Sequence, residues 1–189
     1  MFCEGKVTEP DYVNGLRRLP EISSENSLKI EISPEHAVPL KLVEMAVERS
    51  RDEEVDECWC IFDVEWPKKH PNLEDAVAMA KENKIKLAIS NPCFELWLLL
   101  HFADHNACVS NRDMERMSQK YDGRRGKAID AAVYMPRRHE AARRARRLQA
   151  RHERDGKGFP DNNPSSGMFE FLEALETPRG DKSRHQGPR

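Results

Sequence analysis

The sequence predicts an α/β fold: a mostly parallel sheet of about four strands, flanked by helices, with a helical C-terminal appendage. Strand and helix patterns alternate along residues 1–104, as is typical of parallel strands joined by right-handed crossovers. Residues 58–64 are almost continuously apolar and carry an acid near their end, so they suit a strand buried on both faces at the centre of such a sheet. Beyond residue 105 the strand patterns fade and helical patterns take over.

The individual elements follow from apolar periodicity, because a period of two marks strands and a period near 3.6 marks amphipathic helices. The first strand is short beside the usual parallel strand of about five or six residues, so a start upstream of Met1 is one expectation. We expect strands at residues 1–4, 28–32, 58–64 and 85–89, and helices at residues 8–19, 39–50, 73–83, 91–102, 113–121, 127–134, 138–154 and 168–175, with a loop at 156–167.

Charge divides the chain into two parts. Residues 1–102 hold 12 Lys and Arg against 20 Asp and Glu, and the remainder holds 19 against 13, although the formal net charge is only -2. An acidic first part and a basic second part favour different partners, such as cations and phosphates. We expect an α/β core at residues 1–104, a helical part at residues 105–176 that packs on it, and a disordered polar tail at residues 177–189.

Cysteine usage and hydropathy favour a cytoplasmic protein. The five cysteines are odd in number and lack the paired CxxC spacing of a structural zinc site. The longest apolar run, at residues 96–100, is far shorter than the ~20 residues that a membrane span needs, and no signal-peptide pattern precedes it. We therefore expect reduced thiols, a cytoplasmic location and no membrane partner.

Two carboxylates follow the predicted central strand. Asp63 and Glu65 are two residues apart, so in an extended chain their side chains leave on the same side and share one space. Ionised carboxylates that are held together raise each other's pKa unless a hard cation such as Mg²⁺ neutralises them. The alternative is a pair of solvated acids in an ordinary loop after a strand.

A third carboxylate ends the first predicted strand. Glu4 precedes Gly5, which allows a tight turn or a close approach that a side chain would block. If the first strand and the strand at residues 58–64 are neighbours, Glu4 faces Asp63 and Glu65, as a metal ligand or a general acid–base group. Taken alone, Glu4 is more typical of a terminal surface residue.

Four further polar residues have a structural and a functional interpretation. Glu95 lies in the first turn of a predicted helix, where its charge favours the helix dipole; orienting a metal-bound water or a nearby cation is the functional alternative. Asn91 is first the N-cap of that helix and second a substrate contact. Glu9 is either a helix cap or a further site residue. His101, which has a histidine four residues later but no HExxH glutamate, is expected to be structural or exposed.

The predicted helix at residues 138–154 is rich in arginine. Arginine binds phosphate bidentately and stays charged, so such a helix can contact DNA or RNA in a sequence-independent, salt-sensitive way. The alternative is a solvated helix balanced by the acidic first part, and no aromatic residue within the helix suggests base stacking. The candidate nucleic-acid-binding residues are Arg143, Arg144, Arg147 and Arg151.

Four blocks of the sequence resemble the RloB-like family. They are CEGKVTEPDY at residues 3–12, FDVE at 62–65, SNPCFELWLLLH at 90–101, and NPSS at 163–166 followed by an amphipathic helix. The third block is the most distinctive of the four. Because the blocks occur in order along the chain, the resemblance covers most of it except the tail.

The resemblance implies a fold and an activity. RloB-like proteins are regarded as Toprim-fold, Rossmann-like proteins of bacterial restriction and anti-phage loci, and Toprim enzymes use a glutamate after the first strand and a DxD after a later one. These positions correspond to Glu4, Asp63 and Glu65, which would hold Mg²⁺ or Mn²⁺ and, with Glu95, form the catalytic site of a nuclease in abortive infection. The implied partners are nucleic acid and an ATPase from the same defence locus.

Two departures from that pattern keep a second hypothesis open. Glu65 stands where the motif has a second aspartate, and only two residues precede Cys3 to complete the first strand. The alternative function is therefore a non-catalytic subunit that binds nucleic acid or a partner through a degenerate Toprim site. No residue pattern favours RNA over DNA as the substrate.

Overall fold

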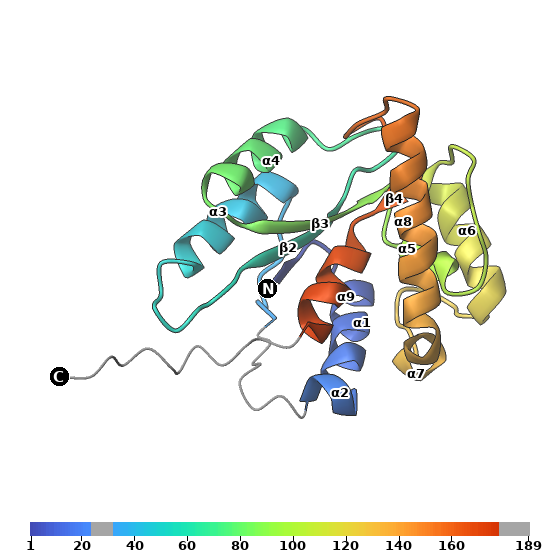
Figure 1. The fold of residues 1–189 in the computed structure, drawn as a ribbon, viewed down its shortest axis with the longest axis horizontal. Helices are drawn as coiled ribbons and strands as arrows, with labels where there is room; N and C mark the ends of the chain where they lie inside the picture. The colour runs from blue at the N-terminus through green and yellow to red at the C-terminus, as the bar shows by residue number, and fades with distance from the viewer. Residues whose placement is uncertain (24–31, 178–189) are drawn as a thin grey trace.

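A four-stranded sheet forms the centre of the computed structural model, which describes residues 1–23 and 32–177 (Figure 1). The strands are β1 (Phe2–Cys3), β2 (Trp59–Asp63), β3 (Lys86–Asn91) and β4 (Ser165–Ser166), in that order across the sheet. β1, β2 and β3 are parallel, whereas β4 pairs antiparallel with β3. The α/β fold with a mostly parallel sheet of four strands is therefore confirmed.

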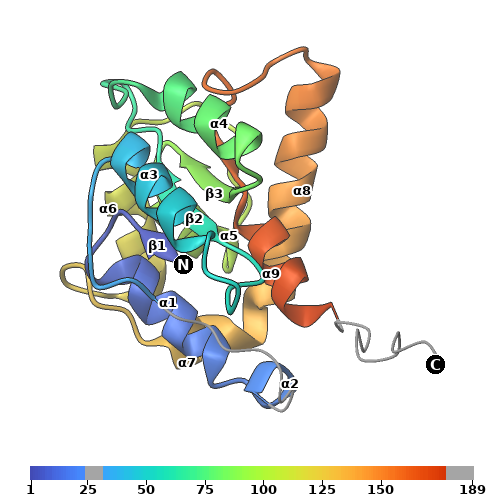
Figure 2. The same cartoon turned by 90° about the vertical axis from the view of Figure 1, so that its left-hand side faces the viewer.

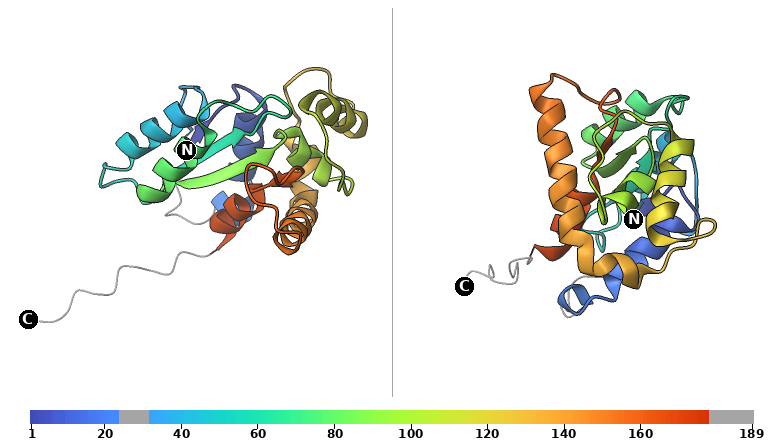
Figure 3. Two further views of the ribbon diagram at one scale, coloured as in Figure 1. Left: turned by 90° about the horizontal axis from the view of Figure 1, so that it is seen from above. Right: turned by 90° about the vertical axis from the view of Figure 1, so that its right-hand side faces the viewer.

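Helices cover both faces of this sheet. Figure 2 shows α3 and α4 together, and in Figure 3 (left) the sheet separates the cyan α3 from the orange α8 and red α9. The described helices are α1 (Thr8–Arg17), α2 (Pro20–Ser23), α3 (Pro39–Arg49), α4 (Leu73–Glu82), α5 (Glu95–Leu100), α6 (Asn111–Asp122), α7 (Ala131–Tyr134), the 3-10 helix η1 (Met135–Arg137), α8 (Arg138–Arg154) and α9 (Met168–Glu176).

The apolar sequence of β2 explains the two layers, because alternate residues of a strand point to opposite faces. Trp59 and Ile61 pack into one core with residues of α1, α5, α8 and α9. Cys60 and Phe62 pack into a second core with residues of α3 and α4. A strand that serves two cores must be apolar at every position, as this one is until Asp63.

Some predicted elements differ from the structure. The strand expected at residues 28–32 lies largely outside the described residues, and Ile32 is in no strand. The helix expected from Asn91 begins only at Glu95, so the N-cap assignment of Asn91 was wrong. Asn91 instead ends β3, because it pairs with Ser165, and its side-chain amide donates to the carbonyl of Pro160 at 3.0 Å.

The chain after residue 105 contributes a strand as well as helices. The expected loop at residues 156–167 contains β4, a Ser-Ser pair without the apolar alternation that marks a strand. Gly167 follows it and donates its N–H to the Ile89 carbonyl at 2.8 Å. A Cβ on Gly167 would lie 3.2 Å from the Ile89 nitrogen, so a glycine suits this close approach. The boundary at 104/105 stays a prediction, and residues 178–189 of the expected tail lie outside the described part of the chain.

Two further expectations concern cysteines and membranes. All five cysteines are free thiols, four of them buried. Over residues 1–23 and 32–177, no helix has the length and apolar character needed to span a bilayer.

Candidate active site

Glu4 and Asp63 meet at the carboxyl ends of two neighbouring strands. β1 and β2 pair with Cys3 opposite Ile61, and the Glu4 N–H extends this ladder by donating to the Ile61 carbonyl at 3.0 Å. The Asp63 N–H donates to Glu4 Oε2 at 3.0 Å. The expected adjacency of these two residues across parallel strands is present in the structure.

The other oxygen of Glu4 faces a histidine that sequence reasoning missed. His70 Nε2 lies 2.6 Å from Glu4 Oε1, and the side chains are 19% and 20% exposed. The backbone places His70 here, because its N–H donates to the Val64 carbonyl at 3.1 Å. Burial raises the pKa of Glu4, while the Asp63 N–H and His70 act in the opposite direction. No sequence pattern points to this pair beyond a histidine in the loop after an acidic strand end.

Asp63 has a raised pKa and a buried carboxylate oxygen. Burial raises its pKa well above the ordinary value, and the charges of Glu9, Glu95 and Glu4 add to the effect, in that order. The Phe94 N–H opposes it by hydrogen bonding. Asp63 Oδ1 is buried and has no hydrogen-bond partner within the described part of the chain. The carboxylate therefore has unused ligating capacity.

Glu9 joins the same cluster, although the sequence made it only a secondary candidate. Its side chain is buried, and its carboxylate lies against Gly5 so closely that a Cβ there would overlap with it. Burial raises the pKa of Glu9 to about 7, helped by Glu95 and Glu4 and opposed by Lys127. Gly5 thus permits the close approach of a carboxylate, where the sequence had suggested a turn or a backbone contact.

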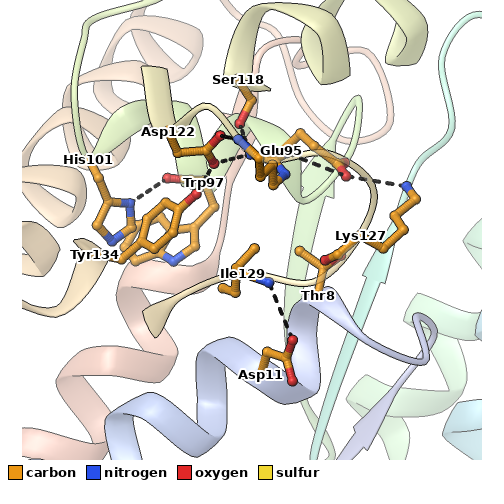
Figure 4. A network of polar contacts seen from close by, with 11 residues as sticks. Thr8, Asp11, Glu95, Trp97, His101, Ser118, Asp122, Lys127, Ile129 and Tyr134 are labelled. Carbon is orange, nitrogen blue, oxygen red and sulfur yellow. Dashed lines mark hydrogen bonds and ion pairs between the residues drawn. The ribbon is translucent and has the colours of Figure 1, made fainter. Parts of the chain in front are cut away.

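Glu95, the first residue of α5, also belongs to the cluster, and its carboxylate lies beside Lys127. The carboxylate is 5% exposed and lies 3.3 Å from Lys127 Nζ, with Arg124 Nη2 at 4.0 Å. Figure 4 shows how the segment between α6 and α7 carries Lys127 to this position. Thr8 Oγ1 donates to the Lys127 carbonyl at 2.8 Å, and the Ile129 N–H donates to Asp11 at 3.4 Å. Two contacts with α1 therefore hold the segment beside Glu95.

Glu65 lies at the edge of the cluster rather than beside Asp63 on an extended strand. Its φ of 66° is left-handed, so strand alternation no longer sets the direction of its side chain. The Glu65 N–H donates to the Pro92 carbonyl at 3.0 Å, and its carboxylate accepts from the Asn111 amide. The charge of Glu65 is among those that raise the pKa of Glu4. Glu4 thus interacts with both Asp63 and Glu65.

Comparison with known proteins decides the family. A family model described as RloB-like protein matches residues 1–175, which includes every residue of the acidic cluster. The chain belongs to the RloB-like protein family. No curated protein and no solved structure matches it.

The acids of this RloB-like chain are suited to a hard cation by their chemistry more than by their present arrangement. Carboxylate oxygens are the ligands that Mg²⁺ prefers, and Asp63 Oδ1 lacks another partner among the described residues. Across that same part of the chain, however, no group of three His, Cys, Asp or Glu side chains is arranged to hold a metal ion. Glu4 contacts His70, and Glu65 contacts Asn111. Metal binding by Glu4, Asp63 and Glu65 stays a prediction.

His101 of the RloB-like chain is structural, as expected. Its Nδ1 lies 2.8 Å from the Trp97 carbonyl and its Nε2 lies 3.1 Å from the Tyr12 hydroxyl. The ring is buried, and burial lowers the pKa of His101 to about 4. A neutral imidazole between two fixed partners serves the core between α1 and α5.

The candidate arginines of α8 all have partners within the RloB-like chain. Arg144 is 15% exposed and donates to the Leu100 carbonyl at 2.6 Å, which ties α8 to the end of α5. Arg143 pairs with Glu140 at 2.5 Å. A pocket of about 660 Å³ lies farther along, lined by Asp104, Asn106, Arg147, Ala150, Arg151 and Arg154.

Two of the pocket arginines are also engaged. Arg147 pairs with Asp104 at 2.6 Å, and Arg151 donates to the Asn106 carbonyl at 2.8 Å. Nucleic-acid binding by Arg143, Arg144, Arg147 and Arg151 stays a prediction, and for Arg144 the burial indicates a structural role.

Proposed function

We propose that this RloB-like chain is a Toprim-like, metal-dependent nuclease that hydrolyses phosphodiester bonds in anti-phage defence by abortive infection. The observation that carries the proposal is the gathering of Glu4 and Asp63, at the ends of β1 and β2, with the buried acids Glu9 and Glu95. Like charges in one buried space are costly, and a divalent cation such as Mg²⁺ or Mn²⁺ is the partner that relieves the cost. The raised pKa of Asp63 and its unpartnered oxygen support this choice.

The cluster has parts for each role in such a reaction. Asp63, Glu4 and Glu65 would hold the metal, which when bound polarises the phosphate and activates water. Lys127 Nζ lies 3.3 Å from the Glu95 carboxylate, so Glu95 would orient this cation towards the site. Glu9, whose pKa burial raises to about 7, exchanges a proton near neutral pH, which suits a general base.

The test is cleavage of labelled tRNA, single-stranded DNA and duplex DNA with Mg²⁺, Mn²⁺ or EDTA. Asp63→Asn keeps the shape of the side chain and removes its charge. The matched control is Glu82→Gln, an exposed acid at the end of α4. We expect metal-dependent cleavage by the unmodified protein and the control, and at least ~100-fold slower cleavage by Asp63→Asn. Equal cleavage by all three proteins would contradict the proposal.

A non-catalytic subunit is the second candidate. It is favoured by the contacts that occupy Glu4 and Glu65, and by the absence of a ready three-ligand group among the described residues. Such a protein would bind nucleic acid, or an ATPase from the same defence locus, without cutting. Calorimetric titration with Mn²⁺ separates the candidates: a nuclease binds the ion and loses binding in Asp63→Asn, whereas a degenerate site takes up no ion in either protein.

The ATPase partner is a proposal that rests on the family resemblance. Co-expression of the chain with the ATPase of its locus, followed by co-purification, tests it directly. Cleavage that appears only in the co-purified complex would identify the ATPase as the activating partner.

A further inference from the structure

The loop between β2 and α4 carries a tryptophan, Trp66, next in sequence to Glu65 at the edge of the acidic cluster. Trp66 follows Glu65 and is partly exposed, whereas Trp59 is 7% exposed and Trp97 is fully buried. The buried pair have aromatic neighbours, since Trp59 meets Phe171 and Trp97 meets Tyr12 edge to face. A large indole left partly in water, next to catalytic-type acids, needs a different explanation from core packing.

The side chain of Asn111 holds both Trp66 and Glu65 by hydrogen bonds. Asn111 Oδ1 accepts from the Trp66 N–H at 2.9 Å, and the Asn111 N–H donates to the Trp66 carbonyl at 3.0 Å. The amide of Asn111 also donates to the Glu65 carboxylate. The start of α6 therefore holds the indole-bearing residue and a site acid in a constant relation, as a preorganised site requires.

Positive charge accompanies this indole. Lys69 Nζ lies 5.4 Å from the centre of the Trp66 ring and 2.6 Å from Asp161 Oδ1. Lys68, beside it in sequence, is exposed. An aromatic ring flanked by cations is the combination that binds single-stranded nucleic acid, where the ring stacks on a base and the cations contact phosphate. The arginines of α8, in contrast, have no aromatic residue interleaved in their helix.

We propose that Trp66 stacks on an unpaired nucleobase of the substrate while the exposed Lys68 contacts its phosphates. This inference rests on the proposed function and deepens it, because it selects single-stranded or looped nucleic acid over duplex. In a duplex the faces of each base are covered by its neighbours, so an indole can stack only on a base outside such a stack. Stacking is tolerant of sequence, and the site therefore accepts RNA and DNA strands alike.

The experiment measures binding apart from cleavage. The full chain, in EDTA, is titrated with oligothymidylate, oligouridylate and a duplex of equal length while tryptophan fluorescence is followed. Because Trp59 and Trp97 are buried, quenching by a stacked base reports on Trp66. We expect both single strands to bind with quenching and the duplex to bind more weakly with little quenching.

Variants separate stacking from charge. Trp66→Ala is expected to lower the affinity for single strands about ten-fold, which corresponds to about 1.4 kcal/mol, and Trp66→Phe to retain most of the affinity while losing the quenching. Lys68→Ala should reduce the slope of log affinity against log salt concentration by about one, which corresponds to one phosphate contact. The matched control is Lys81→Ala, an exposed lysine of α4.

The outcomes distinguish this inference from the nuclease proposal. Binding through Trp66 without cleavage in any metal would support the stacking site and contradict the nuclease. Asp63-dependent cleavage with unchanged affinity in Trp66→Ala would support the nuclease and contradict the stacking site. Duplex binding as tight as single-strand binding, with equal quenching, or no binding of either, would overturn the stacking site.

Discussion

The acidic ends of β1 and β2 and the arginine-rich helix α8 are both dense in one sign of charge, yet their surroundings differ. On α8 the arginines have partners within the chain: Arg147 forms an ion pair with Asp104, and Arg151 donates a hydrogen bond to the Asn106 carbonyl. In the acidic cluster, Glu9 and the Oδ1 atom of Asp63 are buried, and further acids raise the pKa of each residue. We therefore take the acidic cluster, where like charges are buried together, as a better candidate for a functional site than the charge-dense α8.

The largest expected effect is on the pH dependence of stability. The pKa of Glu9 rises from 4.5 to about 7 on folding, so between these values the folded protein binds a proton that the unfolded chain releases. Stability from this group is complete below pH 4.5 and is lost as pH rises to about 7. Glu9→Gln should therefore gain about 3 kcal/mol relative to the unmodified protein across that window, because one pKa unit corresponds to about 1.36 kcal/mol.

Urea denaturation in EDTA at half-unit steps from pH 4.5 to 8 measures this difference. His101 contributes in the opposite direction, since burial lowers its pKa to about 4, but it is present in both proteins and cancels. A constant difference between the two proteins across the window would show that Glu9 ionises normally. Saturating Mg²⁺ should reduce the difference above pH 7 if a cation joins the cluster.

The next largest effect tests the compensated arginines. Arg144→Ala removes a charge-assisted hydrogen bond to the Leu100 carbonyl from a mostly buried side chain, and should lower the free energy of unfolding by about 2 kcal/mol. Arg143→Ala is the matched control one residue away. Its side chain is 62% exposed and pairs with Glu140, so we expect a much smaller change than for Arg144→Ala. Equal losses in urea denaturation would remove the distinction between the two arginines.

The sequence predicted the strand that carries the site better than it predicted the contacts of the site. Uniform apolarity identified residues 58–64 as a central strand, and the acid near its end placed Asp63 correctly beside Glu4. The pairing with β4 was missed because Ser165 and Ser166 carry no apolar pattern. Their strand exists through its backbone contact with β3.

Contacts between side chains that are distant in sequence were also not predicted from the sequence. No local pattern links Glu4 with His70, because the backbone hydrogen bond from His70 to Val64 is what places the imidazole beside Glu4. The burial of Glu9 likewise depends on Gly5 leaving room for its carboxylate. Both features arise from tertiary packing, whereas periodicity reports only on each element's own faces.

Asp63→Asn is also expected to change stability. Neutralising this carboxylate beside Glu9, Glu95 and Glu4 removes a repulsion, so the variant should be more stable than the unmodified protein at pH 8 in EDTA. Stabilisation together with loss of cleavage is the pattern of a site strained for function. Denaturation midpoints compared with Glu82→Gln measure it, and a destabilised Asp63→Asn would mean that the charge supports the fold.

The smallest effect is expected from the cation at the edge of the cluster. Lys127 lowers the pKa of Glu9 and contacts Glu95, yet its side chain is 61% exposed, so water screens much of its charge. Lys127→Met keeps most of the length of the side chain, and it should raise the pKa of Glu9 by about half a unit in an NMR titration of labelled glutamates, with Lys81→Met unchanged. A full unit or more would make Lys127 a principal counter-charge of the acids; no change would leave burial and the neighbouring carboxylates as the controls on Glu9. Either way, the size of the shift measures how far the acidic cluster is compensated from within the chain, which is the property that separates it from α8.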